Sequence, residues 1–159
     1  MSTTATITLT VNGEATTALV PTRKNLVDFL REDLGLTGSH VGCEHGVCGA
    51  CTLLVDGQTV RGCLMLAVQA DGAEVTTVEG LADSGQSTAL RAAFAERNAL
   101  QCGFCTPGMM ASALEYVESG GPADRAAIRE HLSGNYCRCT GYQAIVDAIC
   151  DVIEKGGTS

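Results

Sequence analysis

Tryptophan is absent from this chain of 159 residues, and aromatic residues make up only 4% of it. Basic residues are scarce too: 10 Lys and Arg stand against 18 Asp and Glu, which gives a formal net charge of −8. Because phosphate binding needs a basic patch, this charge argues against a nucleic-acid partner. The acidic surface could steer a basic partner, although solubility is its ordinary role.

Long apolar segments and catalytic signatures are missing as well. No hydrophobic run approaches the roughly 20 residues that span a bilayer, so we expect no transmembrane segment. The start of the chain lacks the charged and apolar regions of a secretory signal, which predicts a cytoplasmic protein, with export beside a signal-bearing partner as the alternative. We find no GxSxG, P-loop or Rossmann fingerprint, and His40, His45 and His131 stand isolated along the chain. We therefore expect no catalytic residue.

Cysteine and glycine are, by contrast, plentiful, with 9 and 19 residues. In a secreted domain this cysteine count would indicate disulfides, whereas clustered cysteines in a reducing cytoplasm indicate metal binding. The odd total also fits poorly with a closed disulfide framework.

The first half of the chain has the pattern of a small sheet. Apolar residues alternate over 5–20 around Asn12-Gly13, which predicts a β-hairpin. Helical spacing predicts a helix over 24–34, and a Gly- and Cys-rich loop follows. A second hairpin around an Asp-Gly turn is predicted over 52–61, and a short strand over 74–78.

The second half is helical. The fold class predicted is therefore α+β, with a sheet domain over 1–78, a linker over 79–86 and a helical domain over 87–159. Four helices are predicted, over 87–98, 107–118, 123–132 and 141–155.

Capping residues mark the ends of these helices. Thr106 before proline predicts one helix start, and Thr140 with Gln143 predicts a capping box at another. Gly134 stands where a C-terminal cap belongs. Both starts follow a cysteine pair, so we expect the metal site of this half at the N-terminal ends of two helices.

The first cysteine set has the spacing C-x4-C-x2-C followed by a distant fourth cysteine, which is typical of plant-type ferredoxins that bind a 2Fe–2S cluster. Glycines in the loop let the backbone wrap around the cluster and donate N–H groups to sulfur. Structural zinc fits this spacing less well, and a Rieske centre would need a second histidine beside His45. The residues of the set are Cys43, Cys48, Cys51 and Cys63.

The second set consists of a C-x-x-C pair, Cys102 and Cys105, and a C-x-C pair, Cys137 and Cys139. A C-x-x-C pair can also be a redox dithiol of the thioredoxin type, but no βαβ pattern surrounds this one. Zinc bound by four thiolates is a further alternative. Helix N-termini favour an anionic iron–sulfur cluster. Arg138 either adds positive charge there or is a surface arginine. The ninth cysteine, in the last predicted helix, receives no function.

Three stretches of the sequence are specific when taken together. Gly42–Cys51, Gln101–Gly108 and Gly134–Tyr142 closely resemble the iron–sulfur small subunit of the xanthine oxidase family of molybdenum hydroxylases. This family includes aerobic carbon monoxide dehydrogenase, aldehyde oxidoreductases and bacterial N-heterocycle dehydrogenases. The resemblance covers essentially the whole chain.

The resemblance implies a β-grasp plant-type ferredoxin domain followed by a four-helix domain, each with one 2Fe–2S cluster. It implies a large subunit with a molybdenum pyranopterin, often extended with cytosine dinucleotide, and a medium subunit with FAD. A dimer of heterotrimers is expected. Electrons would pass from molybdenum to the helical-domain cluster, then to the plant-type cluster and FAD.

By matching position, the second cysteine set would hold the cluster near molybdenum and the first set the cluster near the flavin. Gln101 matches a family glutamine that hydrogen-bonds the pterin, and Cys139 lies at the pterin-facing edge. Local bonding at a helix end is the other interpretation of Gln101. Two alternatives to an electron-transfer subunit are a free-standing ferredoxin and a zinc-stabilised interaction module without redox activity.

Overall fold

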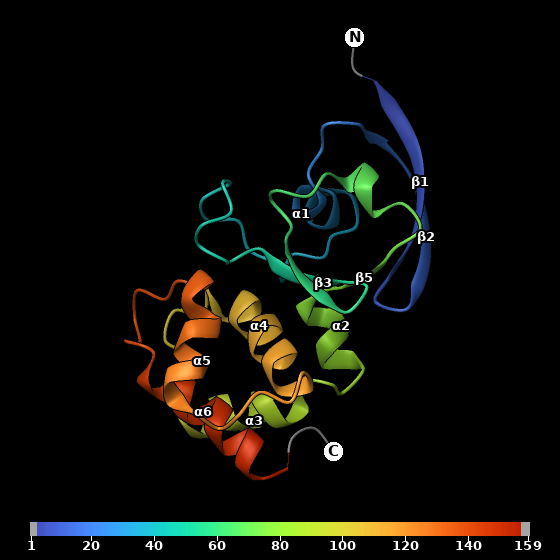
Figure 1. Ribbon diagram of the computed structural model, residues 1–159. Coiled ribbons are helices and arrows are strands. Elements are labelled where there is room, and N and C mark those ends of the chain that lie inside the picture. The colour runs from blue at the N-terminus through green and yellow to red at the C-terminus, as the bar shows by residue number, and fades with distance from the viewer. Residues whose placement is uncertain (1–2, 157–159) are drawn as a thin grey trace.

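The computed structural model describes residues 3–156, so the outermost residues of the two predicted domains, 1–2 and 157–159, lie outside the described part. Figure 1 shows a sheet domain and a helical domain packed against each other. The predicted α+β class is confirmed.

The sheet domain holds five strands in the order β2-β1-β5-β3-β4. The two hairpin pairs are antiparallel, β5 is antiparallel to β3, and β1 with β5 is the parallel pair. This arrangement around one helix is the predicted β-grasp. The strands are β1 Thr4–Val11, β2 Glu14–Pro21, β3 Thr52–Val55, β4 Gln58–Arg61 and β5 Glu74–Thr76.

Both predicted hairpin turns are present. Asn12 and Gly13 have φ of 52° and 83°, and Asp56 and Gly57 have φ of 50° and 77°. Two successive residues with positive φ match the right-handed twist of the paired strands, which explains the Asn-Gly and Asp-Gly sequences.

The helix predicted over 24–34 is present but mostly not α-helical. A short α1, Leu26–Asp28, begins at Asn25, whose side chain accepts the Asp28 N–H, and continues as the π-helix η1, Phe29–Asp33. Its apolar face is buried under the sheet. A 3₁₀ turn, η2, follows β4 at Ala67–Ala70.

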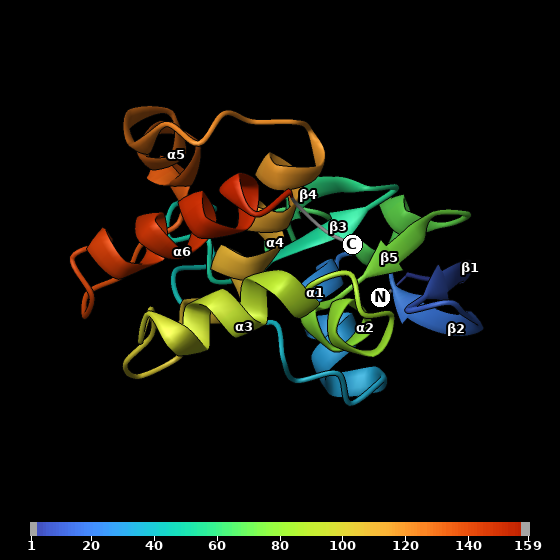
Figure 2. The same ribbon diagram turned by 90° about the horizontal axis from the view of Figure 1, so that it is seen from below.

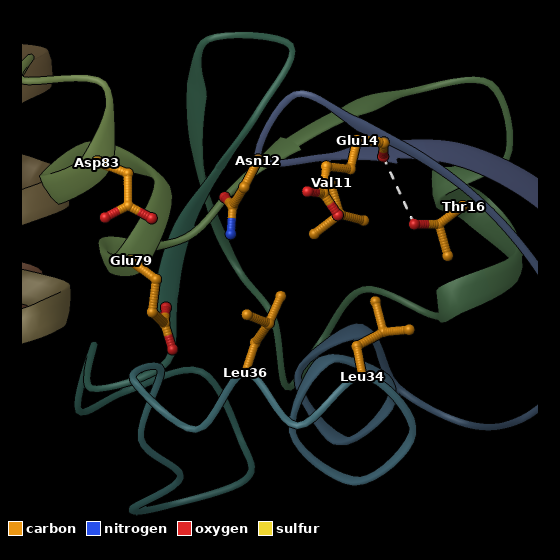
Figure 3. Close-up of a pocket in the computed structure, with 8 residues that line it drawn as sticks. All are labelled: Val11, Asn12, Glu14, Thr16, Leu34, Leu36, Glu79 and Asp83. Carbon is orange, nitrogen blue, oxygen red and sulfur yellow. Dashed lines mark hydrogen bonds between the residues drawn. The ribbon is translucent and has the colours of Figure 1, made fainter.

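Part of the predicted linker forms a helix, α2, Val78–Asp83. Its Glu79 accepts the backbone N–H of Gly38 at 2.7 Å and so holds the loop that leads to the first cysteines. Figure 3 shows Glu79 and Asp83 of α2 facing Asn12 and Leu36 across a pocket. The linker prediction missed α2 because so short a helix depends on tertiary packing, here the burial of Leu81.

The helical domain contains the four predicted helices, which pack around one another as Figure 2 shows from below. A 3₁₀ turn, η3, Leu132–Gly134, extends the third of them. The helices are α3 Thr88–Glu96, α4 Thr106–Glu118, α5 Arg125–His131 and α6 Gln143–Glu154.

Three predicted caps are wrong. Thr106 lies inside α4, and Cys105 takes the cap position before it. Thr140 does not cap α6, which begins after Tyr142, a residue with φ of 68°. Gly134 ends η3 instead of capping α5 in the left-handed region, and its missing side chain leaves room for the guanidinium of Arg61. The thiol of Cys137 accepts the Thr140 hydroxyl, and Arg61 fills the space beside Gly134.

Each domain has its own hydrophobic core, and one strand serves both. Leu53 and Val55 face the core of the sheet domain, whereas Leu54, only 6% exposed, faces the helical core. Alternation along β3 therefore attaches the sheet to α4. Within residues 3–156, no helix is long and apolar enough to cross a membrane.

Candidate iron–sulfur sites

The first cysteine set converges on a loop between η1 and β3. Cys51 is 2% exposed, and the other three thiols are half-buried. The β3–β4 hairpin returns the chain, so Cys63 lies within hydrogen-bonding reach of Cys51. The prediction that the hairpin brings Cys63 back to the loop is confirmed.

Backbone N–H groups in this loop point at sulfur. The N–H of Cys48 lies 3.3 Å from Cys43 Sγ, and hydrogen bonds from the backbones of Cys48 and His45 lower the pKa of Cys43 to about 6. Burial instead raises the pKa of Cys51 to about 11. Thiolates are the form that binds metal, so iron would replace the proton on Cys51.

The second cysteine set lies at the start of α4 and in the turn that follows η3. Cys102 and Cys139 are exposed, with their Sγ atoms 3.7 Å apart. Cys105 and Cys137 are half-buried and within hydrogen-bonding reach of each other. Burial raises the pKa of Cys105 to about 12. The site therefore adjoins the N-terminal end of α4, as predicted, but is separated from α6 by the turn 140–142.

The eight thiols of the two sets lie in four pairs: Cys43 with Cys48, Cys51 with Cys63, Cys102 with Cys139, and Cys105 with Cys137. Within residues 3–156, His, Cys, Asp and Glu side chains do not form a group of three or more that could hold a metal ion. Two thiolates on one tetrahedral metal with bonds of about 2.3 Å lie roughly 3.8 Å apart, close to the distance between Cys102 and Cys139. A 2Fe–2S cluster needs two thiolates on each of two irons. Four thiols arranged as two pairs therefore match the ligands that one 2Fe–2S cluster requires.

Residues after the C-x-C pair tune its inner thiol. Burial tends to raise the pKa of Cys137, but hydrogen bonds from the hydroxyl and backbone N–H of Thr140, at 3.1 and 3.4 Å, outweigh it and the pKa is lowered. The hydroxyl of Tyr142 accepts the N–H of Cys137 at 2.9 Å. Sequence reasoning assigned Thr140 to a capping box and gave Tyr142 no role, since neither contact follows from spacing.

We expect Thr140→Val to lower the reduction potential of the helical-domain cluster. A hydrogen bond to thiolate sulfur stabilises the more negative, reduced state, so its loss disfavours reduction. A bond of about 1 kcal/mol corresponds to ~40 mV for a one-electron couple. An EPR-monitored redox titration measures the shift, with the plant-type cluster in the same sample as internal control. An equal shift of both clusters would contradict this role of Thr140.

The two cysteine sets are joined by one backbone hydrogen bond. The N–H of Tyr136, the residue before Cys137, donates to the carbonyl of Cys48 at 2.8 Å. A further contact joins the loop before Cys43 to the residue before Cys105: the ring of His40 stacks on Phe104, and its Nδ1 lies 2.8 Å from the Phe104 carbonyl. His40 is therefore not isolated in space, although it is along the chain.

The remaining predicted residues have local surroundings. The Gln101 side chain donates to the carbonyl of Cys139 at 3.0 Å, and Arg138 is exposed between two cysteines. Cys150 is buried in the helical core. His131 lies 3.6 Å from the carboxylate of Glu115, so it too has a partner.

Comparison with known families identifies both halves. Residues 9–82 match the model of a 2Fe–2S iron–sulfur cluster binding domain, and residues 77–150 match a second model, described as a [2Fe–2S] binding domain. The two matches overlap within and just before α2. They define the class: a protein with two 2Fe–2S-binding domains in one chain.

Relatives narrow this class to a family. The caffeine dehydrogenase subunit gamma of Pseudomonas sp. strain CBB1 is 55% identical over 92% of this chain and 89% of its own. The nicotine 6-hydroxylase small subunit of Paenarthrobacter nicotinovorans is 52% identical over 91% and 87%. The solved structure of quinoline 2-oxidoreductase from Pseudomonas putida 86 matches with a TM-score of 0.85 and 45% identity over 98% and 99% of the two chains.

The chain belongs to the family of small iron–sulfur subunits of xanthine oxidase-type molybdenum hydroxylases. It is a non-catalytic 2Fe–2S electron-transfer subunit of an oxidoreductase complex, and larger subunits are its partners.

Proposed function

We propose that this subunit relays electrons from a molybdenum pyranopterin, in its cytosine dinucleotide form, through two 2Fe–2S clusters to FAD. The pyranopterin belongs to a large partner subunit and FAD to a medium one. The complex is a cytoplasmic dimer of heterotrimers in this proposal.

The proposed ligands follow the paired thiols. One iron of the plant-type cluster takes Cys43 and Cys48, and the other takes Cys51 and Cys63. In the helical domain the pairs are Cys102 with Cys139 and Cys105 with Cys137. The division into a sheet domain over 1–78, a linker over 79–86 and a helical domain over 87–159 is part of this proposal.

The hydrogen bond between Tyr136 and Cys48 carries the proposal. Each cluster, when bound, would supply a centre that accepts and releases one electron. The chain's part is to bring the two ligand sets together. Cys137 is joined to Cys48 through the backbone of Tyr136 and a single 2.8 Å hydrogen bond, so little space separates the two sites.

The exposed edge of the helical site supports entry of electrons there. Cys102 and Cys139 are exposed, and so are the neighbouring apolar side chains of Leu100, Phe104 and Tyr136. Exposed apolar groups beside a site are typical of a partner interface. Gln101 braces the Cys139 carbonyl at this edge, and we retain it as the proposed pterin contact.

A longer relative supports the proposal that this chain works together with larger subunits. The aldehyde oxidoreductase of Megalodesulfovibrio gigas is 41% identical over 90% of this chain, which covers only 16% of that protein. The same module is there part of one long chain. Relatives named for caffeine, nicotine and quinoline support an N-heterocycle as substrate, chosen by the large subunit.

Metal and cofactor analysis of the anaerobically purified complex tests the proposal. Two 2Fe–2S clusters require about four irons and four sulfides per chain, and two distinct EPR signals should appear after dithionite reduction. Molybdenum and FAD should co-purify. Half the iron with one signal, or zinc, would overturn the relay. Both clusters on a chain purified without larger subunits would indicate a diffusing ferredoxin instead.

A further inference from the structure

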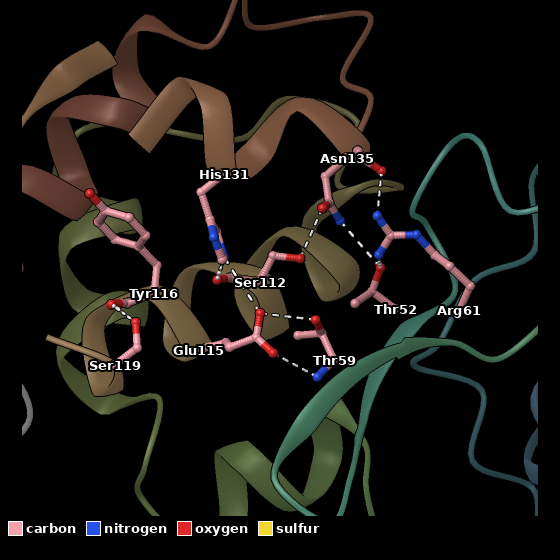
Figure 4. A network of polar contacts seen from close by, with 10 residues as sticks. Thr52, Thr59, Arg61, Ser112, Glu115, Tyr116, Ser119, His131 and Asn135 are labelled. Atoms are coloured by element: carbon pink, nitrogen blue, oxygen red, sulfur yellow. Dashed lines mark hydrogen bonds and ion pairs between the residues drawn. The ribbon is translucent and has the colours of Figure 1, made fainter. Parts of the chain in front are cut away.

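Three successive residues contact the sheet domain directly before Cys137. The carbonyl of Gly134 accepts Arg61 Nη2 at 2.8 Å, and the side chain of Asn135 donates to the carbonyl of Gly49 at 3.2 Å. The N–H of Tyr136 donates to Cys48 at 2.8 Å. Figure 4 shows Asn135 at the point where Arg61, Thr52 and α4 converge. We call residues 134–136 the clamp.

Asn135 is the buried side chain of the clamp, with 2% of its surface exposed. Its Nδ2 contacts Gly49 O and also Thr52 Oγ1, at 3.3 Å, and its Oδ1 accepts the hydroxyl of Ser112 at 2.9 Å. A carbonyl can only accept, so Nδ2 must face Gly49. Every polar atom of the amide is thus occupied, and the amide joins the first cysteine loop, β3 and α4.

The backbone N–H and carbonyl of Asn135 are both hydrogen-bonded as well. Its N–H donates to Leu132 O at 2.9 Å, and its carbonyl accepts the hydroxyl of Tyr142 at 3.0 Å. That same hydroxyl accepts the N–H of Cys137. A movement of Asn135 would therefore be transmitted to Tyr136 on one side and to Cys137 on the other.

We infer that Asn135 is a positioning residue that keeps the Tyr136 N–H against the Cys48 carbonyl and thereby sets the separation of the two clusters. This inference rests on the proposed relay. Asn135 touches neither thiol set with its side chain, so it acts through its neighbours in the chain and through the Gly49 carbonyl.

A second contact between the domains provides a matched control. Glu115 of α4 accepts the backbone N–H and the hydroxyl of Thr59 at 2.8 and 2.9 Å. This contact also joins α4 to the sheet domain but adjoins no cysteine of either set. A residue that merely stabilised the interface would behave as Glu115 does.

The experiment compares Asn135→Ala with Glu115→Ala in the complete complex. Two readouts report position: hydrogen exchange at the Tyr136 amide, and the spin–spin splitting between the two reduced clusters, which falls steeply with their separation. For Asn135→Ala we expect faster exchange, a smaller splitting and a several-fold slower transfer between clusters, with both EPR signals at full intensity. Glu115→Ala should keep the splitting and the exchange rate.

Unchanged exchange and splitting in Asn135→Ala would overturn the inference, and so would equal changes in Glu115→Ala. If Asn135→Ala fails to assemble, Asn135→Asp decides by the same readouts. It retains the acceptor for Ser112 but presents an acceptor to Gly49 O. Should substrate reduce neither cluster in the unaltered complex, the relay itself fails, while the exchange at Tyr136 still tests the role of Asn135.

Discussion

Replacing Cys139 with serine is expected to abolish the EPR signal of the helical-domain cluster and the reduction of this subunit by substrate. Cys139 Sγ lies 3.7 Å from Cys102 Sγ at the exposed edge, and a serine hydroxyl is a poor substitute for a thiolate on iron. The plant-type signal should persist, because its thiols belong to a separate domain with its own core. Dithionite-reduced and substrate-reduced EPR spectra of the complex measure both effects.

Cys150→Ser is the matched control for that variant. Cys150 is buried among apolar side chains of the helical core, away from both proposed ligand sets. The same substitution there should keep both signals and the rate of reduction, at a modest cost in stability. Loss of both signals in Cys139→Ser would contradict independent domains, and unimpaired reduction by substrate would contradict the proposed entry point.

Gly49→Ala is expected to destabilise the subunit by roughly 2–5 kcal/mol. Gly49 has φ of +74°, and a Cβ there would lie 2.3 Å from the carbonyl oxygen of Gly134 and 2.9 Å from the Cα of Asn135. The left-handed backbone costs an alanine about 1–2 kcal/mol, and overpacking against rigid backbone adds about 1–3 kcal/mol. The clash would push apart the first cysteine loop and the clamp. Anaerobic urea unfolding followed by circular dichroism measures the loss.

Gly57→Ala separates the free-energy cost of the left-handed backbone from the cost of overpacking. Gly57 has nearly the same φ, +77°, but a Cβ there meets nothing within 4 Å. It should lose only the conformational part, about 1–2 kcal/mol. Equal losses in the two variants would show that Gly49 does not contact the clamp in solution.

Local patterns carried most of the fold prediction. Asn12-Gly13 and the Asp-Gly turn predicted both hairpins because each turn needs only its own two residues in the left-handed region. The four helices of the second half were found from apolar spacing. Helix α2 was missed, since Glu79 bonds to a loop 41 residues away.

The predicted helix caps failed where another group competed for the capping residue. Thr140 has the sequence of a helix cap, yet its hydroxyl and N–H turn toward Cys137 Sγ. Gly134 has the position of a C-terminal cap, yet the guanidinium of Arg61 occupies the space beside it. Neither competitor can be read from a capping pattern.

The sequence by itself determined the class of protein, because its first cysteine set has the spacing of a 2Fe–2S-binding domain and residues 9–82 match one. It also contains the C-x-x-C and C-x-C motifs of the helical domain, and it determined the family. The tertiary structure decided which thiols meet in twos, which hydrogen bonds tune Cys137, and how the two sites are joined. These depend on groups such as Gly49 and Asn135, which lie 86 residues apart and meet only when the two hydrophobic cores pack against β3.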